Sequence, residues 1–420
     1  MSDIKISIVI PVYNMAEYLD ETIGTWTAQK MPELEIIYIN DASTDTTLKI
    51  LERWRRKDSR IKIINLPENS GPWTARIEGV NCATGEYIMF ADADDTITVG
   101  ACEELYKLIK KNKVDILHFR MNIINVNKKD PRIIKSLKTF VKPYKKKLRG
   151  DEVLTSCFLE GKYQFSLPNK IFSAKTCKRA FSYMKNESLY MAEDKLAYFL
   201  IAFFANSYIG VKTRCCYNYY YGRGGYGRKV LSVEKFERYC SSVIIADRVE
   251  EFLTSQGKKE RFGDIDYLFR KDLVANCFWK YIGEIPEEKK YICFRIMESY
   301  FDQRKKSMSN CKDNLHKIPI TLENEEDRCI DNRDLRDALE QWGYKDVADD
   351  YWIWYCWTYL IRIGTKDQYA GEFIAYITNS YNKSAFFDSS RKSMYWLLKF
   401  NPRLFDMMCV LLGRRKNQEL

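Results

Sequence analysis

Three carboxylates lie close together in the sequence FADADD at residues 90–95, where they are Asp92, Asp94 and Asp95. They directly follow the apolar run at residues 87–90, which has the composition of a short buried strand. In open α/β sheets ligands bind at the carboxyl ends of the strands. Carboxylates placed there suit a hard divalent cation that takes its other ligands from phosphate and water. A solvated acidic turn is the alternative, and we expect a metal and phosphate site.

A second polar stretch, NDASTD at residues 40–45, ends another apolar run and leads into a helical pattern. Ser43 fits the N-cap position of that helix, and Asp45 fits the positive end of its dipole. Asp41 is not needed for capping, and its carboxylate could accept hydrogen bonds from the N–H groups of a nucleobase. The sequence PVYN at residues 11–14 ends the first apolar run and would lie beside it.

A glycine-rich basic segment, YYYGRGGYGRK, occupies residues 219–229. Its cations include Arg223 and Arg228, and neighbouring glycines would let them move. The segment could form a mobile flap whose guanidinium groups meet a diphosphate. An ordinary flexible loop between domains is the alternative.

These residues need elements that bring them to one edge of a sheet. Apolar, β-branched runs alternate with helical patterns over the first 120 residues, which predicts a mostly parallel, Rossmann-like α/β sheet covered by helices on both faces. The expected strands are residues 5–12, 34–40, 61–66, 87–90 and 115–119, and the expected helices are residues 16–29, 44–58, 71–82 and 100–112. Such a sheet is typical of nucleotide-binding proteins.

The pattern changes twice further along the chain. Residues 128–149 hold ten Lys or Arg and one acid, so residues 121–149 are interpreted as a basic connector, either a solvated loop or a surface for an anionic membrane or a lipid-linked phosphate. Helices are then expected at residues 151–160 and 194–204, and strands at residues 207–211 and 216–221. After about residue 230 long helical patterns replace the strand patterns.

We therefore expect two domains. Residues 1–230 would form the α/β domain, with a nucleotide half at about 1–120 and an acceptor half at about 150–230. Residues 231–420 would form a mainly α-helical C-terminal domain that contacts acceptor, partner or membrane and has no chemistry of its own. Its aromatic stretch YWIWYCWTY at residues 351–359 favours a helical core or a subunit interface over a sugar-stacking platform. If it is an interface, the chain would form a homo-oligomer through this domain.

Composition excludes several classes of protein. The 420 residues are 46% hydrophobic and 30% charged, which argues against disorder, and the longest apolar run is about ten residues, too short for a membrane-spanning helix. The N-terminus has no secretory signal pattern, and the 13 cysteines form no CxxC pair, so we expect free thiols and a cytoplasmic protein. The net charge of +11 comes without any nucleic-acid-binding motif. His118 and His316 are isolated, which argues against a zinc cluster or a His-based triad.

Several motifs occur in a fixed order: SIVIPVYN, INDASTD, GPWTARIEG, ATGEYIMFADADD and MAED. Together they resemble an inverting family 2 glycosyltransferase with a GT-A fold, over roughly residues 5–225. The chain departs from the family pattern at Ala42, where glycine is usual, and at Pro168, where a tryptophan is common before Asn-Lys.

The resemblance implies roles for the donor side of the site. In that family the D-x-D pair, here Asp92 and Asp94 with Ala93 between them, coordinates Mn²⁺ or Mg²⁺ on the diphosphate of the sugar nucleotide. The family's aspartate after the second strand reads the uracil ring, which implies Asp41. Pro11 and Tyr13 end the neighbouring strand, and the family's arginine after the third strand, here Arg76, points to the nucleotide.

On the acceptor side, the family's catalytic base is the aspartate of a Glu-Asp pair, which implies Asp194 with Glu193 beside it. The acceptor hydroxyl must lose a proton as it attacks, so a carboxylate without metal is needed there as general base. The alternative for Asp194 is a helix N-cap. Asp95 and Glu193 are expected to support the site or to contact the acceptor.

The sequence thus predicts a metal-dependent inverting glycosyltransferase. It would transfer a sugar from a nucleotide-sugar, most simply a UDP-sugar, to a glycan or lipid-linked acceptor in bacterial surface polysaccharide synthesis, in the cytoplasm or on the inner face of the membrane. A nucleotidyltransferase is disfavoured because the first strand ends in PVYN and not in a Gly-rich, Arg-containing loop. A non-catalytic GT-A-fold subunit that binds glycans or acts as a scaffold is the rival from another class.

Overall fold

The computed structural model describes most of the chain and divides it into two compact units. The described residues are 3–126, 131–184, 189, 191–214, 217–223, 231–302, 332–363, 365–380 and 389–411. The first unit comprises residues 1–230 and 241–270, and the second comprises residues 231–240 and 271–420. A helical segment beyond residue 240 thus packs with the α/β unit, so the compact units do not follow one cut near residue 230.

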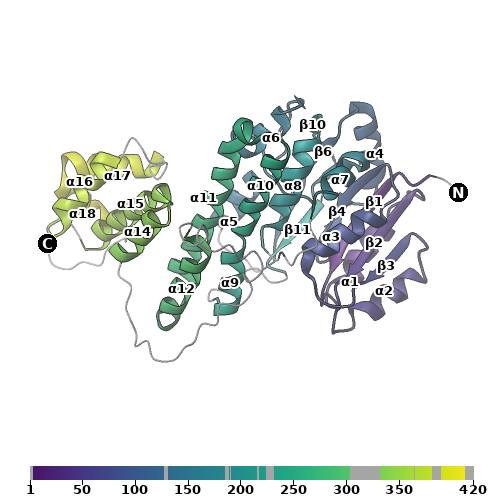
Figure 1. The fold of residues 1–420 in the computed structure, drawn as a ribbon, viewed down its shortest axis with the longest axis horizontal. Helices are drawn as coiled ribbons and strands as arrows, with labels where there is room; N and C mark the ends of the chain where they lie inside the picture. The colour runs from purple at the N-terminus through teal and green to yellow at the C-terminus, as the bar shows by residue number, and fades with distance from the viewer. Residues whose placement is uncertain are drawn as a thin grey trace. The chain divides into compact units, whose positions relative to one another are not determined.

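An eight-stranded sheet forms the centre of the first unit (Figure 1). Its order is β3 (Ile61–Asn65), β2 (Leu34–Asn40), β1 (Ile6–Val12), β4 (Tyr87–Phe90), β9 (Lys170–Ser173), β6 (Ile116–His118), β10 (Ser207–Gly210) and β8 (Leu148–Arg149). Strands β3, β2, β1 and β4 are parallel, as predicted. Strand β9 runs antiparallel between β4 and β6.

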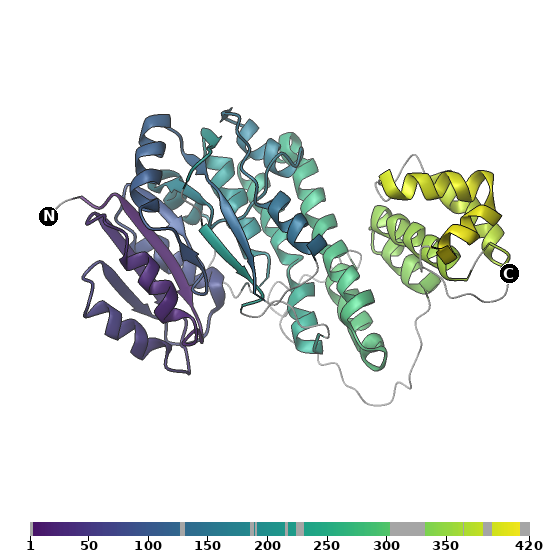
Figure 2. The same ribbon diagram turned by 180° about the vertical axis from the view of Figure 1, so that it is seen from behind.

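Both faces of this sheet are covered by helices, which is why β1 and β2 are apolar along almost their whole length. Helices α1 (Leu19–Thr27), α2 (Thr47–Arg55) and α4 (Ala101–Asn112) share one hydrophobic core with alternate side chains of β1. Helix α3 (Gly71–Cys82) lies on the other face. In Figure 2, which shows the molecule turned by 180°, the face that α1 covers is turned to the viewer. Gly79 lets α3 approach, because a Cβ there would lie 2.4 Å from Val9 Cγ1 and 2.8 Å from Ile39 Cδ1.

A second, three-stranded sheet lies beside the first in the order β5 (Thr96–Ile97), β11 (Tyr217–Tyr221) and β7 (Met121–Asn125). Its pairing places the tyrosines of β11 next to the turn that follows β4. Strand β7 and helix α5 (Pro131–Phe140) come from the segment interpreted as a connector, so the prediction of a solvated loop is wrong for its described residues. The positively charged segment folds because Ile133, Ile134, Leu137 and Phe140 repeat at helical spacing.

The part of the first unit that follows residue 150 is mostly helical. It contains α6 (Glu152–Phe158), α7 (Ala174–Phe181), α8 (Glu193–Phe204), α10 (Ile244–Ser255) and the start of α11 (Lys259–Glu284). Aromatic rings join α8 to α10: Phe252 contacts Phe199, Phe203 and Phe204 with ring centroids 4.8–6.0 Å apart. Helix α10 is thereby fixed against the helix that carries Glu193 and Asp194.

The described residues of the second unit are helical, which confirms the predicted helical C-terminal region. Its elements are α9 (Val233–Ser241), the end of α11, η1 (Glu287–Lys289), α12 (Lys290–Phe301), α14 (Asn332–Gln341), α15 (Lys345–Arg362), α16 (Ala370–Ser380), α17 (Ser389–Phe400) and α18 (Pro402–Leu411). The aromatic stretch lies on α15, where Tyr351, Trp352 and Trp357 are buried, so it belongs to a helical core.

Two further expectations concern the whole chain. The cysteines that the structure describes, Cys82 among them, are all free thiols. Within the described ranges, no helix combines the length and the apolar character that crossing a membrane requires.

Candidate functional site

The turn after β4 is anchored by one of its three carboxylates. Asp95 is fully buried, and its Oδ1 accepts a hydrogen bond of 2.9 Å from the Tyr220 N–H. The Tyr217 hydroxyl accepts a bond of 2.9 Å from the Asp92 N–H. Asp95 and the β11 tyrosines therefore hold the turn, while the side chain of Asp92 remains 38% exposed. The buried Asp95 Oδ2 has no hydrogen-bond partner among the described residues.

The electrostatics of this turn favour an added cation. Desolvation raises the pKa of Asp92 to about 6, against the opposing effect of Arg76. Desolvation also raises the pKa of Asp94, and burial together with Asp92 and Asp94 raises the pKa of Asp95 well above its ordinary value. The carboxylates repel one another in a partly desolvated place, so a divalent cation would relieve this repulsion.

Arg76 connects this turn to the start of helix α8. Its Nη1 donates to Glu193 Oε1 at 2.8 Å, and its Nη2 lies 3.7 Å from Asp92 Oδ1. Burial disfavours the charged guanidinium, but Glu193 and Asp92 outweigh this effect and keep the pKa of Arg76 above its usual value. The Arg76 Nε is buried without a hydrogen-bond partner among the residues described. Sequence reasoning placed Arg76 on the nucleotide and missed this bridge.

Asp194 is not a helix N-cap. Helix α8 begins at Glu193, and the N-cap position is Ala192, whose φ is 60° and which makes no side-chain capping bond. Asp194 Oδ1 instead accepts a bond of 2.8 Å from the N–H of Lys195, the next residue. Desolvation and the negative charge of Glu193 raise the pKa of Asp194 to about 7, although Arg76 acts in the opposite direction. A carboxylate with this pKa can take up a proton near neutral pH.

Asp41 has a structural role that the sequence did not reveal. Its Oδ1 accepts a bond of 2.7 Å from the Ser70 N–H, and its Oδ2 accepts one of 2.9 Å from the Gly71 N–H, so it holds the first turn of α3. A carboxylate has about four lone-pair sites. Two therefore remain for a further donor such as a nucleobase N–H.

The prediction that Ser43 caps the second helix is wrong. Helix α2 begins only at Thr47, and Ser43 Oγ accepts a bond of 3.0 Å from the Asn14 N–H. This bond ties the end of β1 to the end of β2. Ala42, which directly precedes Ser43, has a φ of 53°. This left-handed conformation costs free energy for an L-residue with a Cβ but not for glycine. The backbone conformation at this position therefore favours glycine, the residue that the resemblance gives as usual there.

The remaining donor-side residues lie along the same edge of the sheet. Pro11 pairs with Ile39 in the β1–β2 register, Tyr13 follows β1 with 42% of its surface exposed, and Ala93 is buried in the turn. The Asp41 N–H donates to Val12 O at 2.9 Å, which joins the two strand ends.

Arg223 lies next to the aspartate turn, whereas Arg228 falls outside the described residues. Arg223 Nη1 donates to the Asp94 carbonyl at 3.1 Å and Nη2 donates to Glu21 Oε2 at 2.7 Å. The guanidinium also stacks 3.7 Å from the centre of the Tyr220 ring. Sequence reasoning identified Arg223 but missed its anchor on α1, because nothing in the local pattern around Glu21 indicates a partner.

A buried polar network lies around strands β6, β9 and β10. His118 Nδ1 lies 2.8 Å from the Tyr208 hydroxyl, and Asn169 Nδ2 lies 2.8 Å from His118 Nε2, so this histidine belongs to the core. Lys170 is completely buried, and its Nζ donates to the carbonyls of Gln164 and Ser166. Burial lowers the pKa of Lys170 to about 7. The only sign of this buried lysine in the sequence is its place at the start of the short apolar run KIFS, which forms β9.

The donor set fits a divalent cation that is shared with a ligand. Asp92 and Asp94 offer hard carboxylate oxygens, which suit Mg²⁺ or Mn²⁺. Across the residues that the structure describes, no group of three or more His, Cys, Asp or Glu side chains is arranged to hold a metal by itself. Two protein carboxylates therefore suit a cation whose other ligands are phosphate oxygens and water.

Comparison with known proteins confirms the resemblance and the fold. Residues 7–164 match the family model described as Glycosyl transferase family 2. The chain is 40% identical over 124 residues to the poly(ribitol-phosphate) beta-glucosyltransferase of Bacillus spizizenii, a match that covers 29% of this chain and 20% of that protein. It is 33% identical over 124 residues to the poly(ribitol-phosphate) beta-N-acetylglucosaminyltransferase TarS of Staphylococcus aureus, covering 29% and 22%.

The chain thus spans about a fifth of the length of these curated relatives. Its structure is similar to a crystal structure of Staphylococcus aureus TarS in complex with UDP. The TM-score is 0.50 at 20% identity, and the likeness covers 83% of this chain and 91% of that one. This likeness confirms the mixed α/β sheet with helices around it and a helical C-terminal region.

Proposed function

From the match of residues 7–164 to the Glycosyl transferase family 2 model, we infer that this protein is an inverting glycosyltransferase. It transfers a sugar from a nucleotide-sugar, most simply a UDP-sugar, to a hydroxyl of a glycan or lipid-linked acceptor. Relatives named for poly(ribitol-phosphate) glycosylation and a similar fold with bound UDP support a place in bacterial surface polymer synthesis.

The observation that carries this proposal is the Arg76 bridge. On one side Arg76 lies 3.7 Å from Asp92, the first aspartate of the D-x-D turn, and on the other it bonds to Glu193 at 2.8 Å. Asp194 follows directly on Glu193. A metal-binding turn and a separate carboxylate of raised pKa therefore lie on either side of one guanidinium, as a transferase that joins a diphosphate leaving group to an attacking hydroxyl requires.

In this mechanism Asp194 acts as the general base. The acceptor hydroxyl attacks the anomeric carbon from the side opposite the diphosphate, and the carbon–oxygen bond to the diphosphate breaks as the new bond forms. The hydroxyl proton passes to the Asp194 carboxylate, whose pKa of about 7 lets it accept that proton near neutral pH. Glu193 holds Arg76, and this bond keeps the guanidinium beside the reaction centre.

The donor is held by residues of the β1, β2 and β4 strand ends. Asp92 and Asp94 would hold a Mn²⁺ or Mg²⁺, which when bound neutralises charge on the departing diphosphate. Arg223 lies next to Asp94 and adds a second positive charge there. Pro11, Tyr13 and Asp41 border the place expected for the base and ribose.

The second unit serves contacts and not chemistry in this proposal. Its exposed aromatic side chains, such as Trp279 and Trp396, and the positive charge of the chain are compatible with an acceptor, a second copy of the chain or an anionic membrane surface. The division into a catalytic N-terminal domain and a helical contact domain follows from this assignment.

The test is turnover of UDP-sugars by the full chain, with and without EDTA, together with a thermal-shift series of nucleotides in Mn²⁺. We expect slow hydrolysis of at least one UDP-sugar that EDTA abolishes, and a rise in melting temperature with UDP, because a ligand of the folded state stabilises it by mass action. A non-catalytic scaffold would show glycan binding without turnover of any donor.

A further inference from the structure

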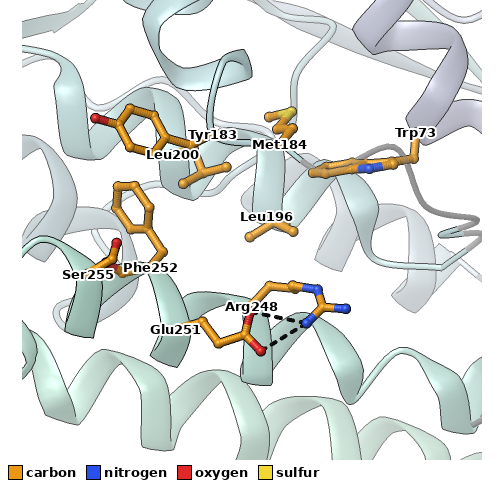
Figure 3. A pocket seen from close by; sticks show the side chains of 9 residues that line it. All are labelled: Trp73, Tyr183, Met184, Leu196, Leu200, Arg248, Glu251, Phe252 and Ser255. Carbon is orange, nitrogen blue, oxygen red and sulfur yellow. Dashed lines mark hydrogen bonds and ion pairs between the residues drawn. The ribbon is translucent and has the colours of Figure 1, made fainter. Parts of the chain in front are cut away.

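A pocket with two chemically different walls lies in the first unit (Figure 3). Trp73 of α3 together with Leu196 and Leu200 of α8 forms an apolar wall. Arg248, Glu251 and Ser255 of α10 form a polar wall, and Phe252 of the same helix adds an apolar ring to the lining. Helix α10 lies beyond the region that matches the family model, whereas Trp73 lies within it.

The pocket lies one helical turn from the proposed catalytic residues on two helices at once. Trp73 precedes Arg76 by three residues on α3, and Leu196 follows Glu193 by three residues on α8. Residues three apart on a helix lie on the same face with Cβ atoms about 5–6 Å apart. Because Arg76 and Glu193 are bonded to each other, the apolar wall, to which both helices contribute, continues directly from this pair.

The pocket has room for one substituted six-membered ring. Its volume is about 270 Å³. A cavity of roughly 150 Å³ lined by aliphatic and aromatic side chains holds a benzene molecule. A ring with several hydroxyl groups therefore fits, whereas an oligosaccharide does not.

The polar wall offers hydrogen bonds without net charge. Arg248 Nη1 donates to both carboxylate oxygens of Glu251 at 3.0 and 3.2 Å, as Figure 3 shows. This ion pair cancels the local charge, so the wall does not attract a phosphate in particular. Guanidinium and carboxylate groups still provide planar donors and acceptors that match adjacent hydroxyl groups.

We propose that this pocket binds a neutral pyranose residue of the acceptor, next to the sugar or polyol unit whose hydroxyl attacks. This inference rests on the proposed function. One face of a pyranose consists of C–H groups that pack on the indole of Trp73 and the leucine side chains, and its edge carries hydroxyls for Arg248, Glu251 and Ser255. A hydrocarbon chain would remove water from the Arg248–Glu251 pair and offer it no hydrogen bond in exchange, which costs free energy. A linear polyol phosphate would bring a charge that the Arg248–Glu251 pair does not neutralise.

The test uses ligand-observed NMR saturation transfer on the full chain, with methyl β-glycosides of glucose, galactose and N-acetylglucosamine as probes. Ribitol 5-phosphate and 1-octanol serve as the charged polyol and the apolar probe. Ser255→Phe places a ring into the pocket from an exposed position at the end of α10. Thr254→Phe, at the neighbouring exposed residue that does not line this pocket, is the matched control. UDP binding is measured on all three proteins.

We expect at least one methyl pyranoside to bind the parent and the Thr254→Phe protein equally, and Ser255→Phe to weaken that binding at least tenfold, with UDP affinity unchanged throughout. Stronger binding of ribitol phosphate or octanol, equal pyranoside binding by Ser255→Phe, or no pyranoside binding would overturn the assignment of the pocket. Absence of UDP binding in the parent would instead contradict the proposed function, and the pyranoside result would still decide what the pocket binds.

Discussion

Replacement of Asp194 by asparagine should separate catalysis from stability. The amide is similar in size and keeps an oxygen that can accept the 2.8 Å bond from the Lys195 N–H. It cannot take up the proton of the acceptor hydroxyl. Loss of a positioned general base slows a reaction by about 10²–10⁴-fold, so we expect transfer to fall by this factor while UDP affinity is unchanged.

If Asp194 is the general base, the activity of the parent should depend on pH by an amount that follows from the pKa of this carboxyl. Since the pKa of Asp194 is about 7, the ionised fraction that can act as a base rises roughly tenfold between pH 6 and pH 8. We therefore expect kcat/KM of the parent to rise with pH through this range and to level off above pH 8. The residual activity of Asp194→Asn should lack this rise.

The raised pKa of Asp194 also predicts the direction in which the stability of the fold changes with pH. Because the folded protein favours the neutral carboxyl, Asp194 stabilises the fold below pH 3.8, and this contribution is lost as the pH rises from 3.8 through about 7. The full difference corresponds to roughly 4 kcal/mol at about 1.4 kcal/mol per pH unit. We expect Asp194→Asn to raise the free energy of unfolding at pH 8 by about 1–4 kcal/mol and to change it little at pH 4.

The assays are donor turnover with acceptor across pH 5.5–9 (roughly the range over which a pKa near 7 is resolved) and urea unfolding at pH 4 and pH 8. Asp264→Asn, an exposed carboxylate of the same unit, is the control and should change neither quantity. An active but less stable Asp194→Asn protein would refute the assignment, because it would mean that the ionised carboxylate stabilises the fold and takes no proton from the acceptor.

Three further predictions follow from the donor side. Asp92→Asn and Asp94→Asn should each weaken UDP binding about tenfold or more in Mn²⁺, a loss of at least ~1.4 kcal/mol in binding free energy, but by less than about twofold in EDTA. If calorimetry in Mn²⁺ gives the variants and the parent the same affinity for UDP, the two aspartates have no metal role. Asp41→Asn should lower the free energy of unfolding by about 1–3 kcal/mol. The amide NH₂ group cannot accept a hydrogen bond, so one of the two backbone N–H groups, of Ser70 or of Gly71, loses its partner. Ala42→Gly should raise it by about 0.5–1 kcal/mol in urea unfolding, since its φ of 53° suits glycine.

Local patterns were sufficient where an element forms from neighbouring residues. The first four strands and the helices between them follow from apolar runs and helical spacing, and α3 has the predicted bounds Gly71–Cys82. Strand β9 was missed, because it has only four residues and begins with a buried lysine, Lys170, which a single-sequence pattern does not assign to a sheet. Its burial depends on the carbonyls of Gln164 and Ser166, which become acceptors only when that loop folds.

The candidate site shows the same division between local and distant information. The D-x-D turn could be identified because it is a short run of carboxylates after an apolar strand, and the Glu-Asp pair because it belongs to the ordered motifs that carry the family resemblance. The contacts that give these residues their properties join distant parts of the chain. Asp41 meets the Ser70 N–H across 29 residues, and Arg76 meets Glu193 across 117.

The contact with Glu193 changes the role that we assign to Arg76. From sequence, Arg76 is a cation for the nucleotide, but in the structure its nearest charged partner is Glu193 on the acceptor side. A diphosphate or its metal at Asp92 would alter the field at Arg76, and a change at Arg76 would reach Asp194 through Glu193, whose charge contributes to the raised pKa of that carboxyl. In the proposed function, a ligand at Asp92 would therefore change the pKa of the proposed base, Asp194, through one buried guanidinium. This connection depends on the packing of α3 against α8, and no single motif contains it.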